Sequence, residues 1–393
     1  MTTVIPYGRQ SVSEDDIRAV VEVLRSEYLT QGPVVPAFER AVADYCDARY
    51  AVAVNSATSA LHIACLSLGV GSGDLVWTSP ISFVASANCA RYCGADVDFV
   101  DINPNTYNIC VARLEGKLER AMISGRLPKV LIPVHLAGQS CEMEVIHALS
   151  RKYGFNIIED ASHAIGGRYK ELAIGSCRFS DITVFSFHPV KIITSGEGGM
   201  ALTNDPVLYG AMARLRSHGI TRAPLEMTHA PDGPWYYQQI ELGFNYRMTE
   251  IQAALGLNQM KRLDSFVSER RVIASYYDKL LSDLPVVLPT QCVESNSSWH
   301  LYIIRVRAGS FPASRAEIFE RLRVSGVMVN LHYIPIYRHP YYEKIGFNIE
   351  DFAEAESYYA EAITLPIYPE LQRNQQEYIC QKIVTPIGHQ TIF

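Results

Sequence analysis

The chain has 393 residues, with 35 Lys and Arg against 41 Asp and Glu, so its formal net charge is −6. Hydrophobic residues make up 48% of the chain, which excludes a disordered protein and allows a sizeable core. A negative net charge without a long run of Lys or Arg argues against binding to nucleic acid or to an anionic membrane. The length predicts two domains.

The cysteines and the N-terminus predict a reduced chain in the cytoplasm. There are nine cysteines, an odd number, and no Cys-x-x-Cys pair. No segment that is first basic and then apolar opens the chain, so no export signal is expected. Residues 50–73 carry no Asp, Glu, Lys or Arg, but Asn, Ser, Thr and Gly interrupt them. They predict a buried strand and helix, and no membrane span.

The first expected elements are a helix that begins at Ser13 and a second helix over residues 36–46. From Tyr50 onward, short apolar runs alternate with helix-length segments. This alternation predicts parallel strands joined by crossover helices, which is an α/β domain. The strands are expected at residues 51–54, 75–77, 98–100, 130–134, 155–158 and 182–185, and the helices at 59–68, 84–92, 112–122 and 143–152.

Beyond Asn245 the pattern changes. Thr249 opens an amphipathic stretch that reaches Leu281, too long for one crossover, and we expect a long helix that joins two domains. Expected strands at 301–306 and 327–331, with a helix at 315–324, predict a smaller α+β unit. We therefore predict a large α/β domain over residues 1–261, with an N-terminal helical segment, and a small α+β domain over residues 262–393.

Several common catalytic motifs are absent, among them Gly-x-x-x-x-Gly-Lys-Ser/Thr, His-Glu-x-x-His and Gly-x-Ser-x-Gly. The glycines at 69, 71 and 73 lack the dinucleotide-binding spacing and follow a predicted helix instead of a strand. An NAD-dependent enzyme and a metal-dependent hydrolase are therefore disfavoured, and no metal site is expected.

Polar segments fall at the carboxyl ends of predicted strands, where α/β sheets bind ligands. Residues 55–60, Asn-Ser-Ala-Thr-Ser-Ala, offer hydroxyls and close backbone approach to an anion at a helix start, although an ordinary helix cap also explains them. Asp160 ends an apolar run, with His163 three residues later. Its carboxylate can pair with a positive ring nitrogen or cap a helix.

Lys191 stands between apolar residues, before a glycine-rich turn. Desolvation there would lower the pKa of its amine and free it for Schiff-base chemistry, although most such lysines extend to solvent. Residues 243–248 form a polar segment before the long helix, by default a capping loop. An anion cradle, an acid and an amine in this chain order match the requirements of pyridoxal phosphate (PLP) chemistry.

The chain resembles the DegT/DnrJ/EryC1/StrS family of sugar-nucleotide aminotransferases from about Ile5 to its C-terminus. The resemblance is closest to the branch that acts in pseudaminic acid biosynthesis, and the segments that carry it are 29–32, 55–61, 79–85, 185–191, 216–219 and 234–237. It implies an α/β fold of the PLP-dependent transferase fold type I. It also implies a cytoplasmic protein that is at least a homodimer.

The resemblance further implies contacts to PLP. Lys191 would form the Schiff base and move protons, Asp160 would pair with the pyridinium nitrogen, and Phe83 would stack on the ring. The remaining contacts would come from Thr58, Ser59 and Ser186 at the phosphate, His163 beside the ring hydroxyl, and Asn245, which would reach the phosphate in the neighbouring subunit.

The sugar nucleotide would be bound, by the same resemblance, by Tyr7, Leu29, Thr30, Ala57, Asn330, His332 and Tyr333. Arg247 and Arg338 are candidate diphosphate partners, although a solvated surface role explains either arginine equally well. Ala57 stands where many family members have Gly, and the pseudaminic acid branch shares the Ala.

The implied reaction transfers an amino group from L-glutamate to C4 of a UDP-linked 4-keto-6-deoxy-N-acetylhexosamine and leaves 2-oxoglutarate. The alternatives are another 4-keto or 3-keto sugar on UDP, dTDP or GDP, a PLP-dependent sugar dehydratase, and a non-catalytic binding protein. Related dehydratases have His in place of the Schiff-base lysine, so Lys191 favours transamination. Lys191 and Asp160 together argue against a protein without activity.

Overall fold

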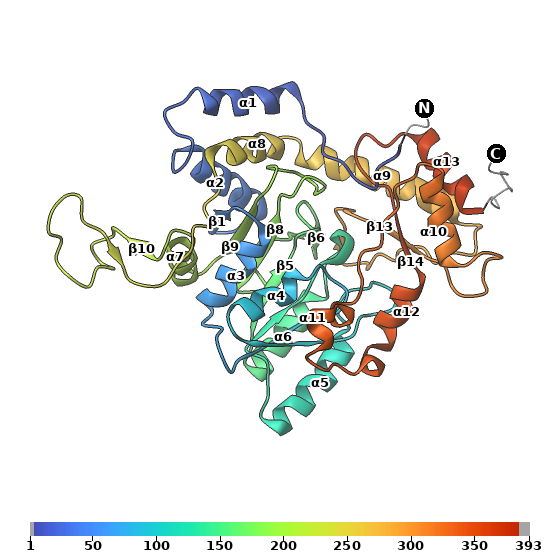
Figure 1. The fold of residues 1–393 in the computed structure, drawn as a ribbon, viewed down its shortest axis with the longest axis horizontal. Coiled ribbons are helices and arrows are strands. Elements are labelled where there is room, and N and C mark those ends of the chain that lie inside the picture. The colour runs from blue at the N-terminus through green and yellow to red at the C-terminus, as the bar shows by residue number, and fades with distance from the viewer. Residues whose placement is uncertain (1–3, 385–393) are drawn as a thin grey trace.

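The computed structural model describes residues 4–384 (Figure 1). Residues 1–3 of the predicted large domain and 385–393 of the predicted small domain therefore lie outside the described residues. Between residues 4 and 384, no helix is both long and apolar enough to cross a membrane.

The central sheet has seven strands in the order β1-β9-β8-β5-β4-β2-β3. β9 runs antiparallel to both of its neighbours, β1 and β8, whereas the strands from β8 to β3 pair in parallel. The predicted α/β fold with a mostly parallel sheet is confirmed, although β9 was not predicted. The strands are β1 (Tyr50–Val54), β2 (Leu75–Thr78), β3 (Asp96–Phe99), β4 (Val130–Ile132), β5 (Asn156–Asp160), β8 (Ile182–Ser186) and β9 (Gly199–Thr203).

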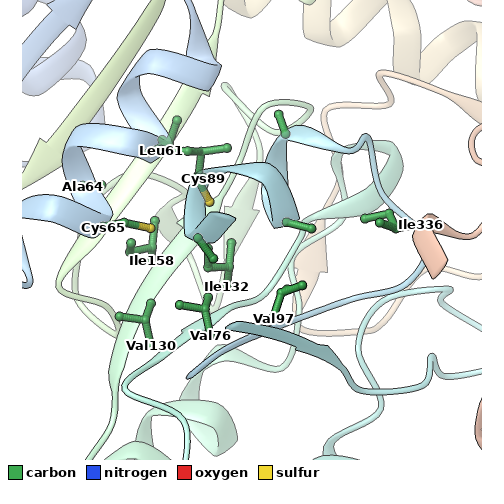
Figure 2. Packing of buried hydrophobic residues seen from close by; sticks show 14 of the residues in the cluster. Leu61, Ala64, Cys65, Val76, Cys89, Val97, Val130, Ile132, Ile158 and Ile336 are labelled. Carbon is green, nitrogen blue, oxygen red and sulfur yellow. The ribbon is translucent and has the colours of Figure 1, made fainter. Parts of the chain in front are cut away.

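Helices cover both faces of this sheet, because successive strand residues point to opposite sides. Val76 packs in one core cluster with α3 and α4, and its neighbour Trp77 packs in another with α5 and α6. Figure 2 shows the first cluster, where side chains of α3 and α4 lie above those of the strands. These helices, with the one after β9, are α3 (Ala57–Ser67), α4 (Ala85–Tyr92), α5 (Val111–Ser124), α6 (Met143–Tyr153) and α7 (Pro206–Leu215).

Three helices pack together at one side of the molecule: α1 (Glu14–Leu24), α2 (Val34–Cys46) and α8 (Glu250–Met260) (Figure 1). The cap of α1 is Ser13, as predicted. Pro33 precedes α2 and supplies no side-chain acceptor. The Glu250 carboxylate takes that role, because it accepts hydrogen bonds from the backbone N–H groups of Val34 (2.7 Å) and Val35 (3.2 Å).

The single long helix expected after Thr249 is wrong, since the stretch forms two helices, α8 and α9 (Leu263–Leu281). Thr249 does cap α8, and the break falls at Lys261 and Arg262. The Arg262 guanidinium donates to the Asp16 carboxylate at 2.5 Å. This contact anchors the turn to α1, a tertiary interaction that local periodicity does not reveal.

The C-terminal part is α+β, as predicted. Its strands β13 (Tyr302–Arg305) and β14 (Ala362–Leu365) pair antiparallel, and their core cluster includes residues of α9, α10 and α13. The expected strand at 327–331 makes only isolated bridges, from Val327 to Ile5 and from Asn330 to Thr364. The domain boundary at residue 262 stays a prediction. The helices are α10 (Arg315–Val324), with the bounds predicted, α11 (Pro340–Glu343), α12 (Ala353–Glu361) and α13 (Arg373–Val384).

An arm projects from the body between α7 and α8 (Figure 1). At its base, β10 (Ile220–Thr221) pairs antiparallel with β11 (Gln238–Gln239). The arm presents apolar side chains to solvent, with Leu225 fully exposed and Trp235 72% exposed. The remaining short elements are β6 (Arg168–Tyr169), β7 (Leu172–Ala173), β12 (Ser295–Asn296), η1 (Leu136–Gly138), η2 (Ile336–Arg338) and η3 (Ile349–Phe352).

Candidate active site

The carboxyl ends of β1, β5 and β8 meet at a cavity of about 970 Å³. Residues 330–333 of the C-terminal part close its other side. The cavity brings together most of the residues predicted from the sequence, which are Tyr7, Ala57, Thr58, Ser59, Phe83, Asp160, His163, Ser186, Lys191, Asn330, His332 and Tyr333. The fold therefore collects them in one place, although they are separated by up to several hundred positions in the chain.

The other predicted residues do not line this cavity: Leu29, Thr30, Asn245, Arg247 and Arg338. The first two are exposed in the loop between α1 and α2, and Asn245 is exposed near the base of the arm. Arg338 donates to the Glu356 carboxylate through Nε at 2.9 and 3.1 Å. Arg247 has a buried Nε without a hydrogen-bond partner within the described chain.

The N-terminus of α3 forms one wall of the cavity. Ser56 caps the helix, since its hydroxyl accepts from the Ser59 backbone N–H at 3.2 Å. Gly199 of β9 lies against this turn so closely that a Cβ there would meet the Ala57 nitrogen at 2.4 Å. Only glycine at 199 allows this approach. The free N–H groups of the helix start, with the hydroxyls of Thr58 and Ser59 beside them, suit an anion such as a phosphate.

Asp160 ends β5 at the floor of the cavity, and both of its oxygens accept hydrogen bonds. Oδ2 accepts from the Ser86 hydroxyl at 2.6 Å, and Oδ1 accepts from the hydroxyl and backbone N–H of Ser162 at 2.6 and 3.2 Å. A carboxylate oriented by donors can hold a positively charged ring nitrogen. The serines were not predicted. Ser86 lies one turn beyond Phe83, and Ser162 two residues after Asp160.

Lys191 enters the cavity from the loop that follows β8. Desolvation lowers the pKa of its amine to about 8, and the Asp160 carboxylate opposes this shift. Its backbone N–H donates to the His188 carbonyl at 2.9 Å, which fixes the turn that carries it. A lysine with a pKa near neutrality can form a covalent bond to an aldehyde and can accept and return a proton.

His163 uses both ring nitrogens within the protein. Nδ1 accepts from the Ala137 backbone N–H at 3.3 Å, and Nε2 lies 3.0 Å from the Tyr333 hydroxyl. Burial, and then the nearby Lys191, hold the pKa of His163 well below its usual value, so the ring is neutral. Since Nδ1 accepts, the proton is on Nε2 and is donated to Tyr333.

His332 and His300 lie at the same end of the cavity as His163. Burial lowers the pKa of His332 to about 3, and its Nδ1 lies 2.9 Å from the Thr364 hydroxyl. His300 was not predicted, since nothing in the local sequence marks it as a site residue. It lines the cavity with its ring centroid 4.4 Å from that of His163.

A mostly parallel sheet that brings a desolvated lysine, an oriented carboxylate and a helix N-terminus to one cavity defines a PLP-dependent transferase of fold type I. Residues 10–384 match the model of the DegT/DnrJ/EryC1/StrS aminotransferase family. The chain belongs to this family and is a sugar aminotransferase.

Two curated relatives are each 36% identical to the chain. One is the spore coat polysaccharide biosynthesis protein SpsC of Bacillus subtilis, aligned over 96% of both chains. The other is UDP-4-amino-4,6-dideoxy-N-acetyl-beta-L-altrosamine transaminase of Campylobacter jejuni (strain 81-176), aligned over 95% of both chains.

Solved structures agree with this assignment. Helicobacter pylori PseC, an aminotransferase involved in the biosynthesis of pseudoaminic acid, has a TM-score of 0.88 and 31% identity over 97% of this chain and 98% of that chain. The PLP form of the putative sugar aminotransferase Spr1654 from Streptococcus pneumoniae has a TM-score of 0.86 and 29% identity, with the same coverage.

Proposed function

We propose that the chain is a PLP-dependent transaminase of pseudaminic acid biosynthesis. It would transfer an amino group from L-glutamate to C4 of UDP-2-acetamido-2,6-dideoxy-β-L-arabino-hex-4-ulose, which gives UDP-4-amino-4,6-dideoxy-N-acetyl-β-L-altrosamine. The observation that carries the proposal is the cavity that joins Lys191, Asp160 and the start of α3. The similarity to the Campylobacter and Helicobacter proteins supports this choice of sugar.

The cavity fits PLP group by group. The start of α3, with Thr58, Ser59 and Ser186, would bind the phosphate, and the Asp160 carboxylate would hold the ring nitrogen in its protonated form. Phe83 lines the cavity and is 58% exposed, so its ring is available to cover a ligand. When bound, PLP supplies the electron sink that makes proton removal from the amine-bearing carbon feasible.

Lys191 would move the protons in both halves of the reaction. Its lowered pKa lets the neutral amine take a proton at one carbon and return it at another. The donor would leave as 2-oxoglutarate before the sugar enters, so both substrates would use the same cavity in turn. His163 does not offer a free nitrogen to the ring hydroxyl of the cofactor, because Ala137 and Tyr333 occupy both.

The sugar nucleotide would extend outward from Lys191. Tyr7, Ala57, Asn330, His332 and Tyr333 line the space that the sugar would fill. Leu29 and Thr30 would contact the nucleotide. Arg247, whose buried Nε has no hydrogen-bond partner among residues 4–384, would be a diphosphate partner in this arrangement. Arg338 would take that role only after its ion pair with Glu356 breaks.

The assembly would be a homodimer in the cytoplasm. Exposed apolar side chains on a projecting arm, such as Leu225 and Trp235, favour burial against a second copy of the chain. Asn245 is exposed beside the base of that arm and would complete the neighbouring active site. Sedimentation of the purified protein would test this part of the proposal.

A product assay by mass spectrometry tests the reaction. The purified protein is supplied with PLP, L-glutamate and, separately, the L-arabino and D-xylo epimers of UDP-2-acetamido-2,6-dideoxy-4-ketohexose. We expect amination of the L-arabino epimer alone. Preference for the D-xylo epimer would assign the chain to another sugar pathway, and loss of water without consumption of glutamate would identify a dehydratase.

A further inference from the structure

The cavity holds little positive charge for a substrate that carries two carboxylates. Among its lining residues in the described chain, Lys191 is the one Lys or Arg. Four histidines line the cavity, and burial lowers the pKa of each of them: His163, His188, His300 and His332. If L-glutamate is the amino donor, this chain offers its α-carboxylate neutral hydrogen-bond donors beside Lys191.

His163, His300 and His332 lie together at one end of the cavity, and two of these three have no N–H to offer. His163 donates Nε2–H to Tyr333, as its contact with the Ala137 N–H requires. In His332, Nε2 lies 3.5 Å from the Asn330 amide nitrogen, which can only donate, so Nε2 is the acceptor. The His332 proton is therefore on Nδ1, which donates to Thr364.

His300 differs from these two. The residue is 4% exposed, and its Nδ1 is buried without a hydrogen-bond partner in the part of the chain that the structure describes. Because Nδ1 has no partner there, it is unsatisfied in either neutral tautomer, as a donor or as an acceptor. The tautomer with the proton on Nε2 offers an N–H donor to the cavity that His300 lines, and Nε2 makes no hydrogen bond among residues 4–384. The Arg270 guanidinium donates to the His300 carbonyl at 3.3 Å and helps to fix its backbone.

Tyr333 supplies a second donor at the same place. Its oxygen accepts from His163, so its own hydroxyl proton must be donated to another group. Burial raises the pKa of Tyr333, which keeps this proton in place at any working pH. Tyr333 and His300 both line the cavity and both lie against the His163 ring, at centroid distances of 6.0 and 4.4 Å.

We propose that the Tyr333 hydroxyl and the His300 Nε2–H together bind the α-carboxylate of the amino donor, beside Lys191. This inference rests on the proposed function, in which an amino acid and a sugar use the cavity in turn. A guanidinium fixed there would be left unpaired when the neutral sugar ring entered, which is unfavourable in a desolvated site. Neutral N–H and O–H donors serve a carboxylate first and a sugar hydroxyl afterwards.

The test measures donor binding apart from sugar binding. The variants are His300→Leu, His300→Gln and Tyr333→Phe, and His147→Gln is the matched control, because His147 lies on α6 outside the cavity lining. Each is loaded with PLP, and its cofactor content and absorbance are recorded first. L-Glutamate is then titrated without sugar, and the change in cofactor absorbance gives the apparent dissociation constant.

We expect His300→Leu and Tyr333→Phe each to weaken L-glutamate binding about tenfold or more, as for hydrogen bonds to a charged group. Cofactor content should stay unchanged. His300→Gln keeps a side-chain N–H and should recover part of the loss. 4-Aminobutanoate, which lacks the α-carboxylate, should lose no more than about twofold between wild type and variants.

Wild-type affinity for L-glutamate in both His300→Leu and Tyr333→Phe would overturn the inference. So would an equal loss for L-glutamate and 4-aminobutanoate, because that pattern indicates general damage to the cavity. If the wild-type protein did not bind L-glutamate but aminated the sugar with another amino acid, only the assignment of L-glutamate as the amino donor would be wrong. The same titration with that amino acid then decides the role of His300.

Discussion

Glu159 and Asp160 are neighbours on β5, are equally buried at 5% exposure, and lie in two different environments. Glu159 faces away from the cavity and accepts from His135 at 2.6 Å, Ser180 at 2.5 Å and Thr183 at 3.2 Å. The other nitrogen of His135, Nδ1, accepts from the Cys141 N–H at 3.1 Å. We call this network the closed side, because its polar side chains form their hydrogen bonds with one another or with the nearby backbone.

The surroundings of Asp160, by contrast, include hydrogen-bonding groups that are not used within the described chain, and we call them the open side. Its carboxylate is also well bonded, but beside it lie the Lys191 amine, the Tyr333 proton and a His300 nitrogen that the described chain leaves without partners. Burial alone therefore does not separate a structural carboxylate from a functional one. Hydrogen-bonding groups without partners next to a cavity do distinguish the functional carboxylate. Substitutions of Glu159 and of Asp160 should therefore have different effects.

The largest effect is expected for Lys191→Ala, on the open side. Loss of the amine removes the group that moves protons, so turnover should fall by about 10⁴-fold, the upper range for such groups. The melting temperature should not fall, since removal of a desolvated amine relieves a cost. Turnover at the wild-type rate would disprove the role of Lys191.

Glu159→Ala, on the closed side, should act on stability. It leaves the buried donors of His135, Ser180 and Thr183 without an acceptor, which should lower the free energy of unfolding by about 3 kcal/mol. Urea denaturation measures this loss. Activity per folded molecule should stay within about twofold of wild type, and a large loss there would mean that the closed network also serves the site.

Asp160→Asn tests the open side without a change of shape. The amide cannot stabilise a positive ring nitrogen, so turnover should fall by about 10²-fold, as when one electrostatic group is removed from a reacting centre. The unfolding free energy should change less than for Glu159→Ala. If the Asp160→Asn variant were as active as the wild-type protein, the proposed pairing of Asp160 with the ring nitrogen would be wrong.

The pKa of Lys191 predicts a pH profile for cofactor capture. Only the neutral amine attacks the PLP aldehyde, and the folded protein lowers the pKa from its usual value to about 8. The capture rate of the cofactor-free protein should therefore rise with pH below 8 and level off above it. Stopped-flow absorbance measures this rate, and a rise that continues to pH 10 would show an unperturbed lysine.

The smallest effect is expected for Arg338→Gln. The Arg338 guanidinium already pairs with Glu356, so its loss should change the KM for the sugar nucleotide by less than about threefold. Arg247→Gln is the comparison variant. An increase of tenfold or more in KM for Arg338→Gln would show that the arginine leaves Glu356 to bind the diphosphate.

Much of the fold could be predicted because local signals agree with the tertiary structure. The Ser13 cap, the bounds of α10 and the strands of the parallel sheet all follow from patterns within a few residues. The break at Arg262 could not be predicted, because it depends on Asp16, far away in the chain. β9 was missed because a short run after glycines carries no periodicity.

The active-site residues also fall into those that the sequence predicts and those that it does not. Lys191, Asp160 and the start of α3 have recognisable neighbours in the sequence, so their grouping was predicted. His300 and Ser86 have none, because their importance comes from contacts across the fold, with His163 and with Asp160. The orientation of each histidine proton also depends on such partners, and no sequence pattern contains that information.

The Glu250 cap on α2 has a consequence for the growing chain. The two residues that it joins, Val34 and Glu250, are 216 positions apart. At about 5–20 residues per second, a ribosome adds the carboxylate roughly 10–40 s after the amide that it will bind. Until then α2 has unpaired amides and no α8 to pack against, so a nascent chain should be most open to proteases between α1 and α2. Pulse proteolysis of stalled chains that end before and after residue 250 would reveal this delayed closure.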